Sequence, residues 1–109
     1  MKIVRLECGP IATNAFFIVT EEAEDAILVD APPGVEEHLQ ALEQESWKQV
    51  QTLFLTHGHW DHMLDAEAVR NRGNVEVYAH PDDRQLIENP ELMANYALPD
   101  LEWTPATVD

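Results

Sequence analysis

Alternating and continuous apolar runs predict strands over the first third of the chain. Residues 2–8 alternate apolar and polar side chains, and the Gly-Pro pair that follows them ends the run. Residues 15–19 and 26–29 are short aromatic or β-branched runs separated by an acidic turn. We therefore predict an opening β-meander with antiparallel pairing, in which at least one strand is largely buried.

From residue 35 onward the pattern alternates between helical and strand periods. Val35, Leu39 and Leu42 recur at spacings of three and four residues within a polar stretch, which is typical of one helix face. Farther along, an acids-first and Arg-last charge order favours a second helix between two apolar runs. The predicted elements are a helix over 35–45, a strand over 50–55, a helix over 63–70 and a strand over 75–79.

This order of elements favours a sheet whose central strands are parallel. A helix between two strands usually carries the chain back so that the strands become parallel neighbours. Ligands in such sheets bind beyond the carboxyl ends of the strands, and Asp30 and His57 each follow directly on a predicted strand end. A short helix is expected from His80 to about Asn89.

Length and charge limit the number of domains and the kinds of partner. With 109 residues, 45% of them hydrophobic, we expect a single partial domain over residues 1–109, with a core at 2–89 and a poorly patterned tail at 90–109. The net charge of −15 disfavours nucleic acid and membrane surfaces as partners. No apolar run approaches a signal peptide or a membrane span, so we expect a cytoplasmic protein.

Four potential metal ligands lie close together in one short segment of the chain. His57 and His59 are two residues apart, so they project to the same side of an extended backbone and can converge on one metal ion. Asp61 and His62 follow the turn into a helix, where their side chains reach a neighbouring volume. The layout predicts two adjacent metal ions, and we take Asp61 as a catalytic residue as well as a ligand.

The ligand types indicate which metals fit and what they would do. Cys8 is the only cysteine, which excludes a thiolate site, and imidazole with carboxylate suits zinc best, with iron or manganese as competitors. Metal-bound hydroxide is then expected to attack an acyl carbonyl of a small molecule. Asp30 and Thr56 are candidates to orient the ligating histidines from behind. Asp30 could equally be a turn former, and the alternative for the whole motif is a loop of solvated or capping histidines.

The string His-Gly-His-Trp-Asp-His at 57–62, after an apolar strand, resembles the His-x-His-x-Asp-His signature of the metallo-β-lactamase superfamily. Residues 13–18 and 27–30 resemble strands of its glyoxalase II-like (hydroxyacylglutathione hydrolase-like) members. The resemblance implies an α/β fold, the N-terminal half of an αββα sandwich, with a mixed sheet and helices on one face. It also implies hydrolysis of a thioester or related acyl bond. By this resemblance His57 and His59 bind the first metal, Asp61 and His62 bind the second, and Asp30 supports the loop.

Two departures from the family pattern shape the expectation. Family members commonly carry glycines soon after the last His of the motif, where this chain has Met63, Leu64 and Asp65. They also complete the site with downstream ligands, so this chain is expected to supply the first half of a dinuclear site. A C-terminal half or a second copy is then expected to cover the open sheet face. The alternatives are a non-catalytic metal-binding or assembly module, a lactonase, or a single-iron sulfur dioxygenase.

Overall fold

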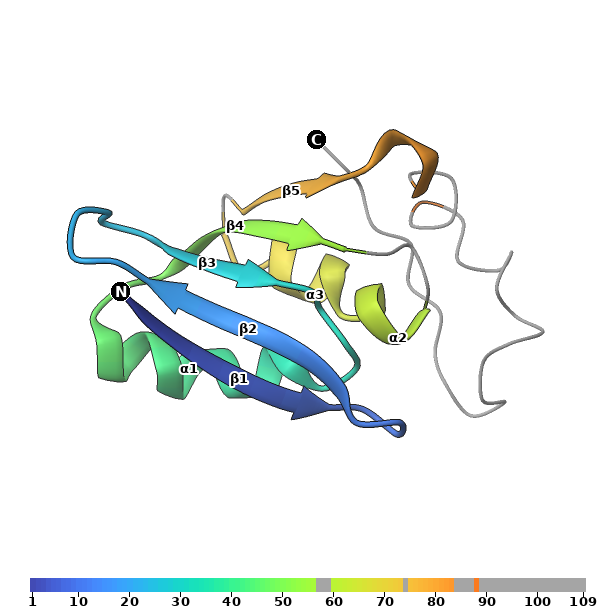
Figure 1. Cartoon of the computed structure of the whole chain (residues 1–109), viewed down its shortest axis with the longest axis horizontal. Coiled ribbons are helices and arrows are strands. Elements are labelled where there is room, and N and C mark those ends of the chain that lie inside the picture. Colours follow the sequence, from blue (N-terminus) through green and yellow to red (C-terminus); the bar gives the residue numbers. More distant parts are fainter. Residues whose placement is uncertain (57–59, 74, 84–87, 89–109) are drawn as a thin grey trace.

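The structure, a computed structural model, describes residues 1–56, 60–73, 75–83 and 88 (Figure 1). For Trp60, Asp61 and Asp82 it describes the backbone alone. The predicted ligands His57 and His59, the tail at 90–109 and much of the helix expected after His80 lie outside these residues. The description of the fold therefore covers the strands and helices between residues 1 and 83, apart from the gaps just given.

The strands form one mixed sheet in the order β1-β2-β3-β4-β5. The first two strand pairs, β1 with β2 and β2 with β3, are antiparallel, whereas β3 with β4 and β4 with β5 are parallel. The predicted meander and the predicted parallel centre are both confirmed. The strands are β1 (Lys2–Cys8), β2 (Thr13–Val19), β3 (Ala26–Val29), β4 (Val50–Leu55) and β5 (Glu76–Ala79).

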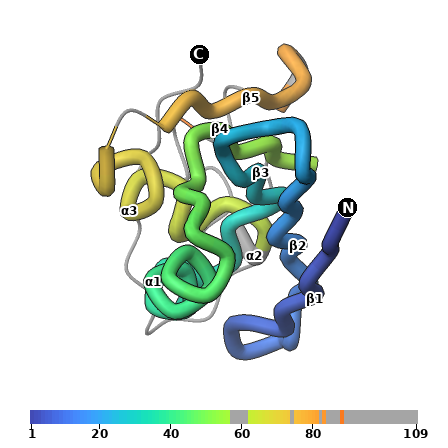
Figure 2. The backbone as a smooth tube through the Cα atoms, turned by 90° about the vertical axis from the view of Figure 1, so that its left-hand side faces the viewer, coloured from blue at the N-terminus to red at the C-terminus, as the bar shows by residue number. Residues whose placement is uncertain are grey.

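The helices lie on one face of this sheet (Figure 2). Alternate strand residues such as Phe17, Leu28 and Leu53 are fully or almost fully buried there, and Leu39 and Val69 from the helices belong to the same core cluster. Burial of each such side chain contributes roughly 1.5–3 kcal/mol. The helices are α1 (Val35–Ser46), α2 (Trp60–Met63) and α3 (Ala66–Arg70), followed by the 3-10 turn η1 (Pro81–Asp83).

One predicted element is wrong, because the helix expected over residues 63–70 is broken. In the structure α2 ends at Met63 and α3 begins at Ala66. The Asp65 N–H donates to the carbonyl of Ala31 at 2.9 Å, outside the helix, instead of to the carbonyl four residues earlier. A contact with a distant segment therefore overrides the helical pattern at this point.

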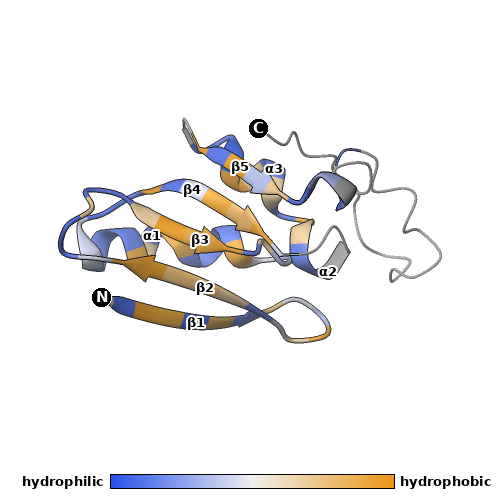
Figure 3. Ribbon diagram, turned by 45° about the horizontal axis from the view of Figure 1, so that its top comes forward, coloured by the Kyte–Doolittle hydropathy of each residue, from blue (hydrophilic) through white to orange (hydrophobic). Residues whose placement is uncertain are grey.

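The opposite face of the sheet carries exposed apolar side chains among the described residues, beside charged ones such as Arg5 and Glu7. The strands β2, β3 and β4 are mostly apolar along their length (Figure 3). Ile3, Phe54 and Tyr78 are 53%, 44% and 38% exposed, and the rings of Phe54 and Tyr78 stack with centroids 5.5 Å apart. Among the described helices, none is both long and apolar enough to cross a membrane.

Candidate metal centre

Asp30 stands at the carboxyl end of β3, where three donors meet its buried carboxylate. Its Oδ1 accepts the N–H of Thr56 at 2.7 Å, and its Oδ2 accepts the Thr56 hydroxyl at 2.6 Å. The same Oδ2 lies 2.8 Å from Nδ1 of His62. Thr56 directly follows β4, the parallel neighbour of β3, so the sheet topology brings both residues to one edge. Thr56 and His62, which lie 26 and 32 positions after Asp30 in the sequence, therefore both contact its carboxylate.

The backbone of Asp30 is held in a left-handed conformation, with φ of 66°. A non-glycine residue in this region stores about 1–3 kcal/mol of strain, although Asp tolerates it better than most residues do. Asp30 is only 4% exposed, and its N–H donates to the Phe54 carbonyl at 2.8 Å. Its side-chain hydrogen bonds offset the strain, so Asp30 both ends the strand and holds His62.

His62 lies on α2, and its side chain is 22% exposed. A hydrogen bond from Nδ1–H to Asp30 favours the tautomer in which Nε2 carries the ring lone pair. Histidines that bind metals usually donate their other ring N–H to a carboxylate in this way. The Asp30 and His62 pair therefore fits the outer part of a metal site, with Nε2 as the ligand atom.

The other three predicted ligands of the motif fall outside the described side chains. His57 and His59 lie outside the described residues, and the side chain of Asp61 is not described. Considering the described side chains alone, no three metal-binding groups converge. The structure thus brings together Asp30, Thr56 and His62, while the other three ligands stay predictions from the motif. Thr56 contacts the carboxylate of Asp30, so it supports the histidine through Asp30.

Asp65 is a contributor to this region that the sequence analysis missed. Its Oδ2 accepts the backbone N–H groups of Gly34 at 2.9 Å and Glu36 at 3.1 Å. Burial raises the pKa of Asp65, these two N–H groups lower it, and the nearby Glu36 and Glu37 raise it again. The available signal was the glycine before the helix predicted from residue 35: Gly34 is the N-cap of α1 and has no side chain for capping, so the helix needs an acceptor from elsewhere.

Comparison with known proteins settles the family. The model of the metallo-β-lactamase superfamily matches residues 8–107. The chain belongs to the metallo-β-lactamase superfamily. It is 28% identical to the "Probable metallo-hydrolase YqgX" of Bacillus subtilis over 109 residues, which is 100% of this chain and 50% of that protein. An uncharacterized protein of Aquifex aeolicus is 31% identical over 97 residues, covering 89% of this chain and 44% of the relative.

Solved structures agree with the superfamily assignment. The BLEG-1 B3 metallo-beta-lactamase matches with a TM-score of 0.80 and 28% identity, covering 97% of this chain and 50% of that one. TTHA1623 in a di-iron-bound form matches with a TM-score of 0.72 and 28% identity, covering 97% of this chain and 54% of that one. The chain thus spans about half the length of its metallo-β-lactamase relatives, and it has the fold of their N-terminal portion.

Three further side chains of possible chemical interest in this superfamily member are His38, His80 and Cys8. His38 is exposed on α1, and His80 is exposed after β5. Cys8 is 6% exposed, and burial together with the charge of Asp65 raises the pKa of its thiol. A buried thiol with a raised pKa is a poor nucleophile, which is consistent with a structural role for Cys8.

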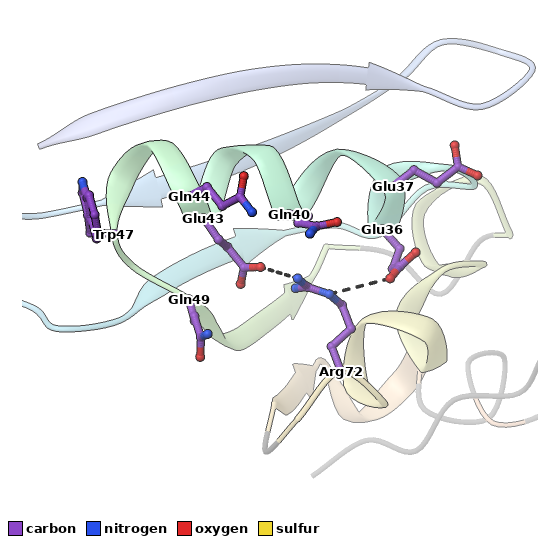
Figure 4. Close-up of a pocket in the computed structure, with 8 residues that line it drawn as sticks. All are labelled: Glu36, Glu37, Gln40, Glu43, Gln44, Trp47, Gln49 and Arg72. Carbon is purple, nitrogen blue, oxygen red and sulfur yellow. Dashed lines mark hydrogen bonds and ion pairs between the residues drawn. The ribbon is translucent and has the colours of Figure 1, made fainter.

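A groove of about 560 Å³ on the outer face of α1 is separate from this centre (Figure 4). Arg72 reaches across it from the segment after α3, and pairs with Glu43 and, at 3.7 Å, with Glu36. The hydrogen bond that Arg72 donates to the Glu43 carboxylate raises the pKa of Arg72. None of Asp30, Thr56 and His62 lines this groove, so the groove and the metal-type chemistry occupy different places.

Proposed function

We propose that the protein is a metal-dependent hydrolase and that this chain supplies the first half of a dinuclear site. The observation that carries the proposal is the 2.8 Å contact between His62 Nδ1 and the buried carboxylate of Asp30. It orients an imidazole of the motif in the way that metal-binding histidines are oriented. Its position beyond the carboxyl ends of parallel strands is the usual ligand position in such sheets.

The proposed roles follow the motif. His57 and His59 would hold the first metal, and Asp61 and His62 the second, with Asp61 also acting in catalysis. A divalent metal bound there supplies a Lewis acid and lowers the pKa of water to about 7. Zinc is the proposed metal, and iron is the main competitor, because the name of one solved relative specifies a di-iron-bound form.

The proposed substrate is a thioester or a related acyl compound, as for the glyoxalase II-like group. Residues 13–18 and 27–30, which resemble strands of that group, support this choice. A solved relative is named a B3 metallo-beta-lactamase, which makes a β-lactam the first competitor to test. A lactone and a persulfide complete the set of substrates that separates the alternatives within the fold.

We also propose that the open face of the sheet is covered in the working protein. The coverage of about half of each relative supports a second half of the sandwich as the cover, with a second copy of this chain as the other candidate. Ile3, Phe54 and Tyr78 would then be buried. The alternative function is a non-catalytic metal-binding module. It is favoured because the chain covers only about half of each relative, and half of a metal site need not catalyse.

The test is turnover of the native protein on this panel, with and without added zinc. We expect the wild type to hydrolyse the thioester. The rate should fall at least about a hundredfold in His62→Ala, because this variant lacks the imidazole that Asp30 orients towards the metal. The matched control is His38→Ala, which removes an exposed histidine on α1 and should leave turnover unchanged. Tight metal binding without turnover of any panel member would favour the non-catalytic module, and full activity in His62→Ala would refute the hydrolase proposal.

A further inference from the structure

One carboxylate fastens the turn between α2 and α3 to the start of α1. Asp65 Oδ2 accepts the N–H groups of Gly34 and Glu36, at 2.9 Å and 3.1 Å. The first N–H groups of a helix lack partners within the helix, and Gly34 as N-cap offers no side chain. Asp65 therefore caps α1 from a position 29 residues away from Glu36 in sequence.

The same turn is joined through the main chain to the loop that precedes α1. The Ala31 N–H donates to the His62 carbonyl at 2.7 Å, and the Asp65 N–H donates to the Ala31 carbonyl at 2.9 Å. Ala31 is the neighbour of Asp30, whose carboxylate holds the ring of His62. Asp30 thus contacts the ring of His62, while Ala31 joins the main chain of His62 to that of Asp65.

We propose that Asp65 is a positioning residue for His62, because it clamps the N-terminus of α1 to the α2–α3 turn and so sets the imidazole against Asp30. The inference rests on the proposed metal site, where the direction of the His62 ring matters. A glycine at position 65 would offer no acceptor to the Gly34 and Glu36 N–H groups. Here a carboxylate holds the turn instead.

The first test is solvent exchange of the His62 Nδ1–H proton, followed by NMR on the metal-free native protein. Asp65→Ala should speed this exchange by about tenfold, because local opening becomes easier when the clamp is lost. Asp65→Asn should stay within about threefold of the wild type, because its amide oxygen still accepts. The matched control is Arg72→Ala, which removes ion pairs from α1 without touching the turn. It should leave the exchange rate unchanged.

The second test is the dissociation constant for zinc of the same variants. Asp65→Ala should weaken zinc binding by about tenfold, as expected for loss of an outer contact, and Asp65→Asn should restore it. If Asp65→Ala does not fold, Asp65→Ser takes its place, because its hydroxyl can cap α3 yet is too short to hold both N–H groups of α1.

The outcomes separate positioning from mere stabilisation. Faster exchange and weaker zinc binding in Asp65→Ala or Asp65→Ser, with rescue by Asp65→Asn, support the proposal. A variant that unfolds more easily but matches Arg72→Ala in both exchange and zinc affinity would overturn it. A wild-type protein that binds no zinc would defeat the proposed function, while the exchange rates in the metal-free protein would still decide the role of Asp65.

Discussion

Two polar networks adjoin α1, and they differ in the segments that they join. At the N-terminal end of the helix, Asp30 is 4% exposed and its carboxylate joins Thr56 and His62. On the outer face, Arg72 pairs with Glu36 and Glu43 beside an open groove of about 560 Å³. The ends of β3 and β4 and the helix α2 meet at Asp30, whereas both partners of Arg72 lie on α1. Convergence of distant segments, and not the size of a hollow, therefore marks the candidate site.

The largest expected effect comes from removing the centre of the buried network. Asp30→Ala should lower the free energy of unfolding by about 3–5 kcal/mol, because the three hydrogen bonds between its buried carboxylate and Thr56 and His62 are lost together. Urea denaturation with a metal chelator present measures this. Asp30→Asn is the matched control and should cost clearly less, because one oxygen remains. A loss below about 1 kcal/mol in Asp30→Ala would show that the network does not stabilise the edge.

Breaking the outer network should cost less and leave the metal site untouched. Arg72→Ala should lower the free energy of unfolding by about 1–2 kcal/mol, because the Arg72 side chain is 23% exposed and that of Glu43 10%. Zinc content should equal that of the wild type. Arg72→Lys, which keeps the charge without the planar fork, should recover part of the stability. A drop in zinc content in Arg72→Ala would mean that the two networks are coupled.

The carboxylate of Asp65, which links the α2–α3 turn to the start of α1, should make the stability of the protein depend on pH. Because the pKa of Asp65 is raised in the folded state above its ordinary 3.8, chiefly by burial, folding favours its protonated form. Stability from this group is present at low pH and is lost as the pH rises from about 4 through the raised pKa. Asp65→Asn should lack this loss. The test is the free energy of unfolding of both proteins across this pH range. An increase in the stability of the wild type relative to Asp65→Asn as the pH rises would contradict the prediction.

The smallest effect is expected at the far end of α1. Trp47 is 93% exposed and adopts φ of 63°, a left-handed conformation that glycine adopts without strain. Trp47→Gly should therefore raise the free energy of unfolding by up to about 1 kcal/mol. Trp47→Ala, which keeps the β-carbon, should give no such gain. A loss of stability in Trp47→Gly would indicate that the tryptophan makes a contact in solution that its exposure does not suggest.

The sequence predicts the strands and their order because each depends on local pattern. Alternation in β1 and the apolar runs of β3 and β4 are visible in the residues themselves, and helix-strand alternation implies the parallel centre. The break at Asp65 is not visible in this way. It depends on Ala31, Gly34 and Glu36, which lie about thirty residues away and reach Asp65 only after the chain has folded.

Part of the candidate site can likewise be predicted from the sequence, and part depends on the fold. The motif predicts the ligands, and the strand ends predict Asp30 and Thr56 as supports of the histidines. The linear pattern does not tell that Asp30 contacts His62 in particular, or that Thr56 acts through Asp30. Those pairings need the parallel register of β3 and β4. The roles of His57, His59 and Asp61 rest on the motif, and the contact that orients His62 rests on the fold.

The metal content of the native protein, measured by elemental analysis after dialysis, tests the central claim most directly. Wild type and His38→Ala should each retain the full complement of metal, whereas His62→Ala should lose at least half of it, because one of the two proposed ions loses a ligand. The same metal content in His62→Ala as in wild type would contradict the account, since the imidazole that Asp30 orients would then have no part in binding metal.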